Sequence, residues 1–72
     1  MKFTIAIEPG TKKTAFGIVV PDLPGCTSGG DTLEDVRERV KEAIALWIEV
    51  QRERGHAIPP PTTVIETIEV AA

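Results

Sequence analysis

Apolar and polar residues alternate in two stretches near the N-terminus, which is the pattern of β-strands with one buried face. The first stretch covers residues 2–8 and ends at Pro9-Gly10, and the second runs from Thr14 to Val20. We expect these two strands to pair as an antiparallel hairpin. The apolar faces consist of Phe3, Ile5 and Ile7 in the first strand and Phe16, Ile18 and Val20 in the second.

Glycines mark two further points of this expected sheet. Gly17 lies on the opposite face of the second strand, where the missing side chain predicts the close approach of another element. A short third strand is expected at residues 26–28, and Gly29-Gly30 ends it. The first thirty residues therefore predict a small, mainly antiparallel sheet.

A long amphipathic helix is predicted at residues 32–54. Asp31 or Thr32 can cap its N-terminus, because each is followed three positions later by an acidic residue, as in a capping box. Gly55 stands where a left-handed residue ends many helices. At about 1.5 Å per residue, the helix would be roughly 35 Å long. Its apolar stripe consists of Leu33, Val36, Val40, Ala43 or Ile44, Trp47, and Val50 or Gln51.

The second half of this helix is apolar over a wider arc than the first half. Ala45 and Ile48 lie outside the main stripe, beside Trp47. Two interpretations are open at this point: a wider core beneath the sheet, or a patch that contacts a partner.

A run of three prolines, Pro59 to Pro61, follows the helix and predicts an extended connector. Residues 64–70 then predict a final strand, in which Glu66 shares a face with apolar residues, as some edge strands do to avoid uncontrolled pairing. The order of elements is β-β-β-α-β. It indicates an α+β two-layer sandwich, with one long helix on a mainly antiparallel sheet. We expect residues 1–72 to form a single domain.

The composition fits a globular protein with a marginal core. Of the 72 residues, 42% are hydrophobic, and a chain of this size buries only about 60% of its unfolded surface. Cys26 is the only cysteine, so no internal disulfide can support the core and oligomerisation is the expected support.

Several observations predict a cytoplasmic protein. No apolar run approaches the roughly 20 residues of a membrane span, and the chain begins with a strand pattern rather than a secretory signal. An unpaired cysteine also suits a reducing compartment. The net charge of −3 argues against direct nucleic-acid binding by this chain.

No group of residues predicts catalysis or a metal site. Two-metal phosphodiester cleavage needs carboxylates that converge on ions about 3.5–4 Å apart, and the carboxylates outside the helix show no such spacing. The helix, roughly 35 Å long, would separate Cys26 from His56, so they predict no nucleophile–base pair. We therefore expect a protein that is not an enzyme and has no cofactor. The carboxylates considered are Glu8, Asp22, Asp31 and Glu66.

The loop between the second strand and the helix is the best candidate for a binding surface. Pro21 and Pro24 fix φ at two positions, and Gly25 allows a positive-φ turn. A rigid loop loses little entropy on binding, so we take Pro21, Asp22, Leu23 and Pro24 as candidates for contact with a partner protein. Leu23 can project from the loop or fill one end of the core, and both roles can hold together.

The residues from Val20 to Leu33 resemble the HicB-like antitoxin family. The resembling features are a strand, then Pro-Asp-Leu-Pro-Gly-Cys, a glycine, and Asp-Thr-Leu-Glu at the start of a helix. Residues 42–47 and Ile58-Pro59 support the resemblance, which covers nearly the whole chain. The family fold is a partial ribonuclease-H-like fold, in agreement with the predicted order of elements.

The resemblance implies the antitoxin of a type II toxin–antitoxin pair. In the family, the partner is a HicA-like mRNA interferase with a double-stranded-RNA-binding-like fold and a catalytic histidine, and the antitoxin masks its active surface. The negative charge of this chain would complement a basic RNA-binding face. Two alternatives stay open. One is an orphan HicB-like interaction module, and the other is a metal-dependent nuclease that would need Asp22 or Asp31.

Many members of the family also carry a C-terminal helix-turn-helix or ribbon-helix-helix module that binds operator DNA. This sequence stops at Ala72, directly after the last predicted strand, so we expect no DNA-binding module and no dimer contacts from one. We still expect a homodimer, formed through sheet edges or through the apolar patch of the helix.

Overall fold

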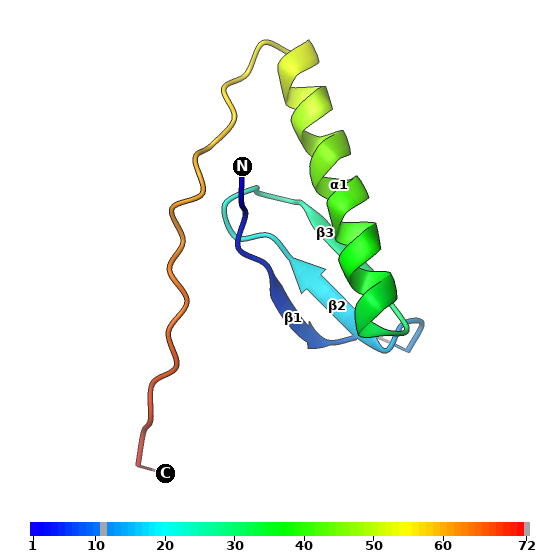
Figure 1. Ribbon diagram of the computed structural model, residues 1–72, viewed down its shortest axis with the longest axis vertical. Helices are drawn as coiled ribbons and strands as arrows, with labels where there is room; N and C mark the ends of the chain where they lie inside the picture. The colour runs from blue at the N-terminus through cyan, green and yellow to red at the C-terminus, as the bar shows by residue number, and fades with distance from the viewer. Residues whose placement is uncertain (11, 72) are drawn as a thin grey trace.

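The structure is a computed structural model that describes residues 1–10 and 12–71. Three short strands form one antiparallel sheet in the order β1-β2-β3, and a single long helix, α1, packs on one face of it (Figure 1). The predicted α+β class, with one long helix on an antiparallel sheet, is confirmed. The elements are β1 (Ala6–Pro9), β2 (Phe16–Val19), β3 (Thr27–Gly30) and α1 (Leu33–Glu53).

The ladder between β1 and β2 is shorter than the alternation of the sequence predicts. Of the expected residues 2–8, only those from Ala6 onwards pair with β2. After Val19 the chain turns into a loop, in which the N–H of Val20 donates to the carbonyl of Cys26 (3.1 Å) and its carbonyl accepts from the N–H of Leu23 (3.0 Å). The next residue, Pro21, has no N–H with which to continue the ladder to β1. The residues before Ala6 therefore continue the direction of β1 with no strand of the described chain beside them.

Helix α1 begins and ends as the sequence predicts. Of the two candidate caps, Thr32 is the one used: its hydroxyl accepts the N–H of Asp35 at 3.1 Å. At the other end, Gly55 has a φ of +72°, and the N–H of His56 returns to the carbonyl of Gln51 at 2.9 Å. This hydrogen bond and the left-handed glycine together form a Schellman motif, which satisfies carbonyls that the helix end would leave unpaired.

The core lies between the sheet and α1. Three of its side chains, Ile18, Leu23 and Val36, are almost completely shielded from solvent, at 0–1% exposed. No helix in the described part of the chain has the length and apolar character needed to cross a membrane. The buried residues of the core are Ile18, Val20, Leu23, Cys26, Val36 and Val40.

The close approach of sheet and helix occurs at Gly30 and not at Gly17. A Cβ at Gly30 would lie 3.0 Å from Val36 Cγ2 and 2.7 Å from a carboxylate oxygen of Asp35. A Cβ at Gly17 would meet only the side chain of Glu8, at 3.9 Å. The prediction for Gly17 is therefore wrong, because this residue pairs with Glu8 at a place where nothing packs closely on the sheet.

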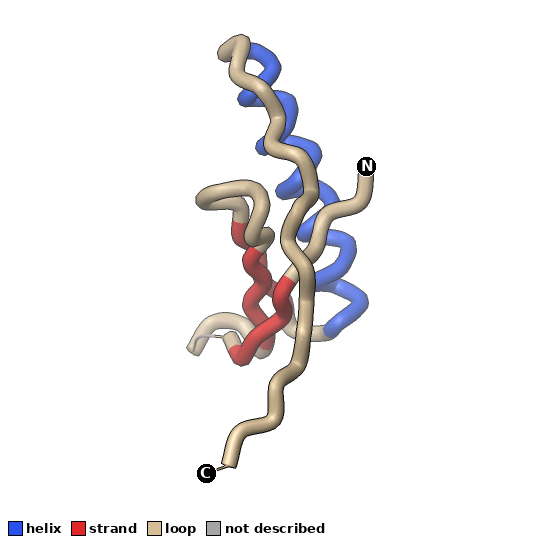
Figure 2. Tube along the Cα trace, turned by 90° about the vertical axis from the view of Figure 1, so that its left-hand side faces the viewer, coloured by secondary structure: helices blue, strands red, loops and turns tan. Residues whose placement is uncertain are grey.

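The prediction of a strand at residues 64–70 is also wrong for the single chain. These residues are extended, but they pair with no strand of the described chain, so its order of elements is β-β-β-α. Figure 1 shows this segment running away from the sheet, and in Figure 2 its end lies beyond the sheet. A strand needs neighbouring backbone to satisfy its hydrogen bonds, and none lies beside it here. We call residues 64–71 the tail.

We predict that Gly30→Ala destabilises the fold by about 1–3 kcal/mol, because the added methyl group must displace a buried valine and an aspartate. Urea unfolding followed by circular dichroism measures this change. Gly17→Ala is the matched control, and we expect its stability to stay within about 0.5 kcal/mol of the parent. Equal effects of the two substitutions would contradict the assignment of Gly30 as the point of close contact.

Candidate protein-binding surface

Residues 20–26 form a loop that three backbone hydrogen bonds close, here called the 20–26 loop. The N–H of Leu23 donates to the carbonyl of Val20 (3.0 Å), and the N–H of Cys26 donates to the carbonyl of Leu23 (3.0 Å). The third hydrogen bond joins the two ends, from the N–H of Val20 to the carbonyl of Cys26 (3.1 Å). The loop is therefore two consecutive β-turns that share Leu23.

The second of these turns explains the Pro-Gly pair. Pro24 occupies the second position of the turn and Gly25 the third, with a φ of +79°. Proline followed by a residue of positive φ is the sequence of a type II turn. An L-amino acid with a side chain would be strained at Gly25, although there is empty space around it.

Leu23 points into the core, where it is 0% exposed. The structure thus places it in the second of its two predicted roles, filling one end of the core. Pro21 and Pro24 are exposed, and Asp22 is half-buried. The accessible surface of the 20–26 loop therefore comes from the two prolines and part of Asp22, held in place by Leu23 from beneath.

Trp47 connects this loop to the helix. Its indole Nε1–H donates to the carbonyl of Pro24 at 3.0 Å. The hydrogen bond spans 23 residues of sequence and fixes the distance between α1 and the tip of the loop. This role is structural, and the loop and the helix together form one surface.

An apolar groove lies beside that hydrogen bond and has a volume of about 400 Å³. We call it the Trp47 groove. Leu46 on its edge is 61% exposed. Of the predicted helix patch, only Trp47 lines the groove, because Ala45 and Ile48 project elsewhere. The groove is lined by Gly25, Cys26, Thr27, Ala43, Leu46, Trp47, Val50, Gln51 and Arg54.

Asp22 holds the chain just before the tail. Its carboxylate accepts the hydroxyl of Thr63 at 2.7 Å, the N–H of Thr63 at 3.2 Å and the hydroxyl of Thr62 at 3.4 Å. The Thr63 hydroxyl is the main reason why the pKa of Asp22 lies below its usual value of 3.8. No sequence pattern indicated this contact, because about forty residues separate the partners.

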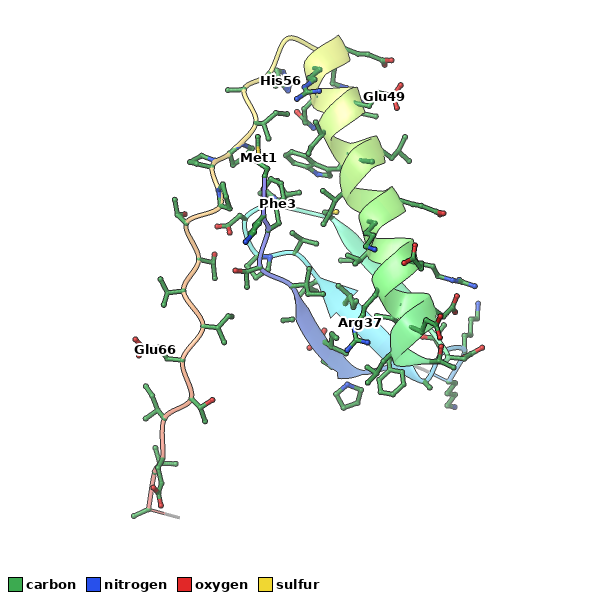
Figure 3. The ribbon with its side chains drawn as sticks, in the orientation of Figure 1. Met1, Phe3, Arg37, Glu49, His56 and Glu66 are labelled. Carbon is green, nitrogen blue, oxygen red and sulfur yellow. The ribbon has the colours of Figure 1, made fainter. Side chains whose placement is uncertain are left out.

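The other residues considered for chemistry do not come together. The carboxyl groups of Glu8 and Asp31 are on exposed residues, and Figure 3 shows Glu66 on the tail, away from the sheet. Within residues 1–10 and 12–71, no group of three or more His, Cys, Asp or Glu side chains could hold a metal ion.

Cys26 and His56 are closer than the sequence argument predicts, and that prediction is corrected here. The chain turns back after β3, so Cys26 lies against the second half of α1, where it shares the Trp47 groove with Gln51. Burial raises the pKa of the Cys26 thiol above its usual value of 9.0, which keeps it protonated and weakly nucleophilic. His56 lies just beyond α1, and its Nδ1 is 2.8 Å from Oε1 of Gln51 (Figure 3).

Residues 3–71 match the family described as the HicB-like antitoxin of bacterial toxin–antitoxin systems. The chain belongs to this family. The resemblance inferred from Val20 to Leu33 is thereby confirmed, and the match extends through the tail.

Relatives of known sequence agree with this family. A UPF0150 protein of Archaeoglobus fulgidus is 44% identical over 52 residues, which cover 72% of this chain and 74% of the relative. A UPF0150 protein of Thermotoga maritima is 40% identical over 65% of this chain and 63% of its own length. An uncharacterized 14.9 kDa protein of Haemophilus phage HP1 is 39% identical, and the match spans only 43% of that longer protein.

Two solved structures share the fold. The crystal structure of TTHA0281 from Thermus thermophilus has a TM-score of 0.74 and 26% identity, covering 90% of this chain and 82% of its own. A chain of the HicA3 and HicB3 toxin–antitoxin complex has a TM-score of 0.72 and 28% identity, covering 86% of this chain and 72% of its own.

We predict that Trp47→Phe lowers the free energy of unfolding by about 1 kcal/mol, because the smaller phenyl ring still packs there but has no N–H to donate to the carbonyl of Pro24. Urea unfolding followed by circular dichroism measures the change. Leu46→Ala, at the exposed neighbouring position, is the control and should stay within about 0.5 kcal/mol. A Trp47→Phe protein as stable as the parent would show that the hydrogen bond contributes nothing.

The contact between Asp22 and Thr63 should depend on pH. The folded-state pKa of Asp22 is lowered, so the contact is complete at pH values above 3.8 and is lost as the pH falls through the lowered pKa. The NMR signal of the Thr63 amide, followed during an acid titration, reports this loss. Asp22→Asn should weaken the contact already at neutral pH, whereas Asp31→Asn should not alter the titration of Thr63.

Proposed function

We propose that this protein is the antitoxin of a type II toxin–antitoxin pair, and that it binds and neutralises a HicA-like mRNA interferase by masking the active surface of the toxin. The observation that carries the proposal is the match of residues 3–71 to the HicB-like antitoxin family. The similarity to a chain of the HicA3 and HicB3 complex supports it, because in that complex a toxin and an antitoxin of this kind occur together.

The 20–26 loop is the proposed contact surface. Its three backbone hydrogen bonds and its two prolines hold the loop in one conformation before any partner arrives. A surface that is already ordered loses little conformational entropy on binding. Pro21 and Pro24 would contact the toxin together with the accessible part of Asp22, while Leu23 anchors the loop from the core.

The Trp47 groove extends this proposed surface along α1. It adjoins the loop at Gly25, and its exposed apolar residue Leu46 offers a contact that the compact 20–26 loop lacks. Interface cores rely on apolar side chains that fill pockets of the partner. An apolar side chain of the toxin seated in the groove would bury both partners' apolar surface.

Masking requires no chemistry by the antitoxin, so in this proposal the protein is not an enzyme and does not itself bind nucleic acid. Its net charge of −3 complements a basic RNA-binding toxin and would speed the encounter of the two. Because the toxin acts on messenger RNA, the complex would form in the cytoplasm. The antitoxin would act as a homodimer, as its small core suggests.

Co-expression with the small basic protein encoded by the adjacent reading frame tests the proposal. We expect a complex that copurifies and restores growth to cells in which that protein is toxic. Failure to form a complex, together with no rescue of growth, would rule out the antitoxin role and leave an orphan interaction module.

Substitutions test the contact surface separately. Pro21→Glu places a charge on the exposed loop and should weaken binding of the co-expressed protein at least about tenfold, which corresponds to about 1.4 kcal/mol. Pro60→Glu makes the same change at an exposed proline of the connector and should bind like the parent. Equal affinities of the two variants would move the contact surface away from the 20–26 loop without affecting the antitoxin role.

A further inference from the structure

The tail exposes more apolar surface than any other part of the described chain. Its four large apolar side chains are far more open to solvent than those of the strands, yet they have the β-branched character of strand residues. No hydrogen bond joins residues 64–71 to the rest of the described chain. The exposed fractions are 77% for Val64, 64% for Ile65, 75% for Ile68 and 75% for Val70.

The size of this exposed surface is that of a protein interface. The chain has an accessible surface of 5643 Å², whereas a compact monomer of its mass would have about 4,400 Å². Its radius of gyration is 13.9 Å, against about 11 Å for a compact domain of this length. The excess area, about 1,200 Å², exceeds the roughly 800 Å² that each partner buries in a standard interface. A partner that covers the tail would therefore restore ordinary compactness.

The same chain has a place that fits the tail. β1 is an edge strand, and the residues before it, from Phe3 to Ile5, pair with no strand of the described chain. Thr63 lies beside them, where its carbonyl accepts the hydroxyl of Thr4 at 3.3 Å. Between them and α1 runs a groove of about 320 Å³, here called the Phe3 groove. Its lining combines the apolar residues Phe3, Ile5, Val40 and Ile44 with the charged residues Glu34, Arg37, Glu38 and Lys41. Phe3 and Arg37 are labelled in Figure 3.

We propose that the tail of one copy pairs as a strand with the β1 edge of a second copy, and that the second copy returns the same contact. Side chains alternate between the faces of a strand, so Val64, Ile68 and Val70 would enter the Phe3 groove of the other copy. Glu66 shares their face. Arg37 lies on the rim of the groove and forms no ion pair within the described chain. Its guanidinium would meet the carboxylate of Glu66.

A second copy is the occupant that the structure favours. One chain contains both the unpaired tail and the unpaired β1 edge. In a two-fold symmetric dimer each tail pairs with the β1 edge of the other copy, so no tail and no edge stays unpaired. Pairing of two tails with each other is disfavoured, because each carries Glu66 and Glu69 and no basic residue. The tail also leaves its own domain: the Asp22–Thr63 contact fixes its start beside Thr4, and beyond that point it runs away from its own β1 (Figure 1).

This inference deepens the homodimer of the proposed function but does not depend on the toxin. The test uses the full chain alone, at micromolar concentration, by light scattering. We expect twice the mass of the chain. Ile68→Glu should place a charge in the Phe3 groove and raise the dimer dissociation constant at least tenfold, with the helix signal in circular dichroism retained. Thr67→Glu adds the same charge on the other face of the tail and should remain dimeric.

Amide hydrogen exchange distinguishes this arrangement from the alternatives. In the proposed dimer the amides of residues 64–70 are protected, and Ile68→Glu removes the protection. A monomer with protected tail amides would place the tail on its own β1 and overturn the proposal. The protein could instead be a monomer whose tail amides become protected only when the co-expressed partner protein is added. That result would assign the tail to the partner and would also overturn the proposal. A dimer with an unprotected tail would also overturn it, because the contact would then lie elsewhere.

Discussion

The closure of the 20–26 loop is the constraint on which the rest of the structure depends. The chain turns into this loop directly after Val19, and Pro21 has no N–H, so the β1–β2 ladder ends at Val19. The same closure directs Leu23 into the core and presents the carbonyl of Pro24 to Trp47. Asp22, which lies in the same loop, reaches Thr63 at the far end of the chain. One small loop thus determines where the sheet stops, how the helix sits and where the last segment begins.

This arrangement separates two surfaces that serve different purposes in the proposals. The loop and the Trp47 groove form a preordered surface next to the second half of α1, suited to a foreign partner. The Phe3 groove lies on the side of α1 where β1 and its N-terminal extension run, and it accepts a strand. The two grooves share no lining residue, but Asp22 of the loop also holds Thr63, directly before the tail, so the two surfaces adjoin there. A symmetric dimer would present two toxin-binding surfaces.

The sequence predicted those parts of the fold that local interactions determine. The caps at Thr32 and Gly55 could be located because each depends on residues within one turn of the helix. The turn at Pro24-Gly25 was recognisable for the same reason. The close packing at Gly30 and the unpaired tail were not, since both depend on which elements meet in space, and the periodicity of a strand does not reveal whether a neighbour is present.

In the candidate site, too, the sequence predicts what depends on local interactions and does not predict which distant residues meet. Pro21 and Pro24 were located from the stiffness that proline gives to any chain, and they are indeed exposed. The sequence left two roles open for Leu23, and only packing against the core decides between them. The contact of Asp22 with Thr63 had no precursor in the sequence, because the two residues approach only after the helix has reversed the chain and the proline connector has returned it.

Trp47 is the only tryptophan of the chain, and its indole ring lies where the loop, the helix and the proposed toxin-binding groove meet. All indole fluorescence of the protein therefore originates at this one junction. The emission wavelength responds to the polarity around the ring and to the hydrogen bond at Nε1. The protein thus carries an intrinsic optical probe at the surface where a partner would arrive, and occupation of the groove can be observed without attaching a label.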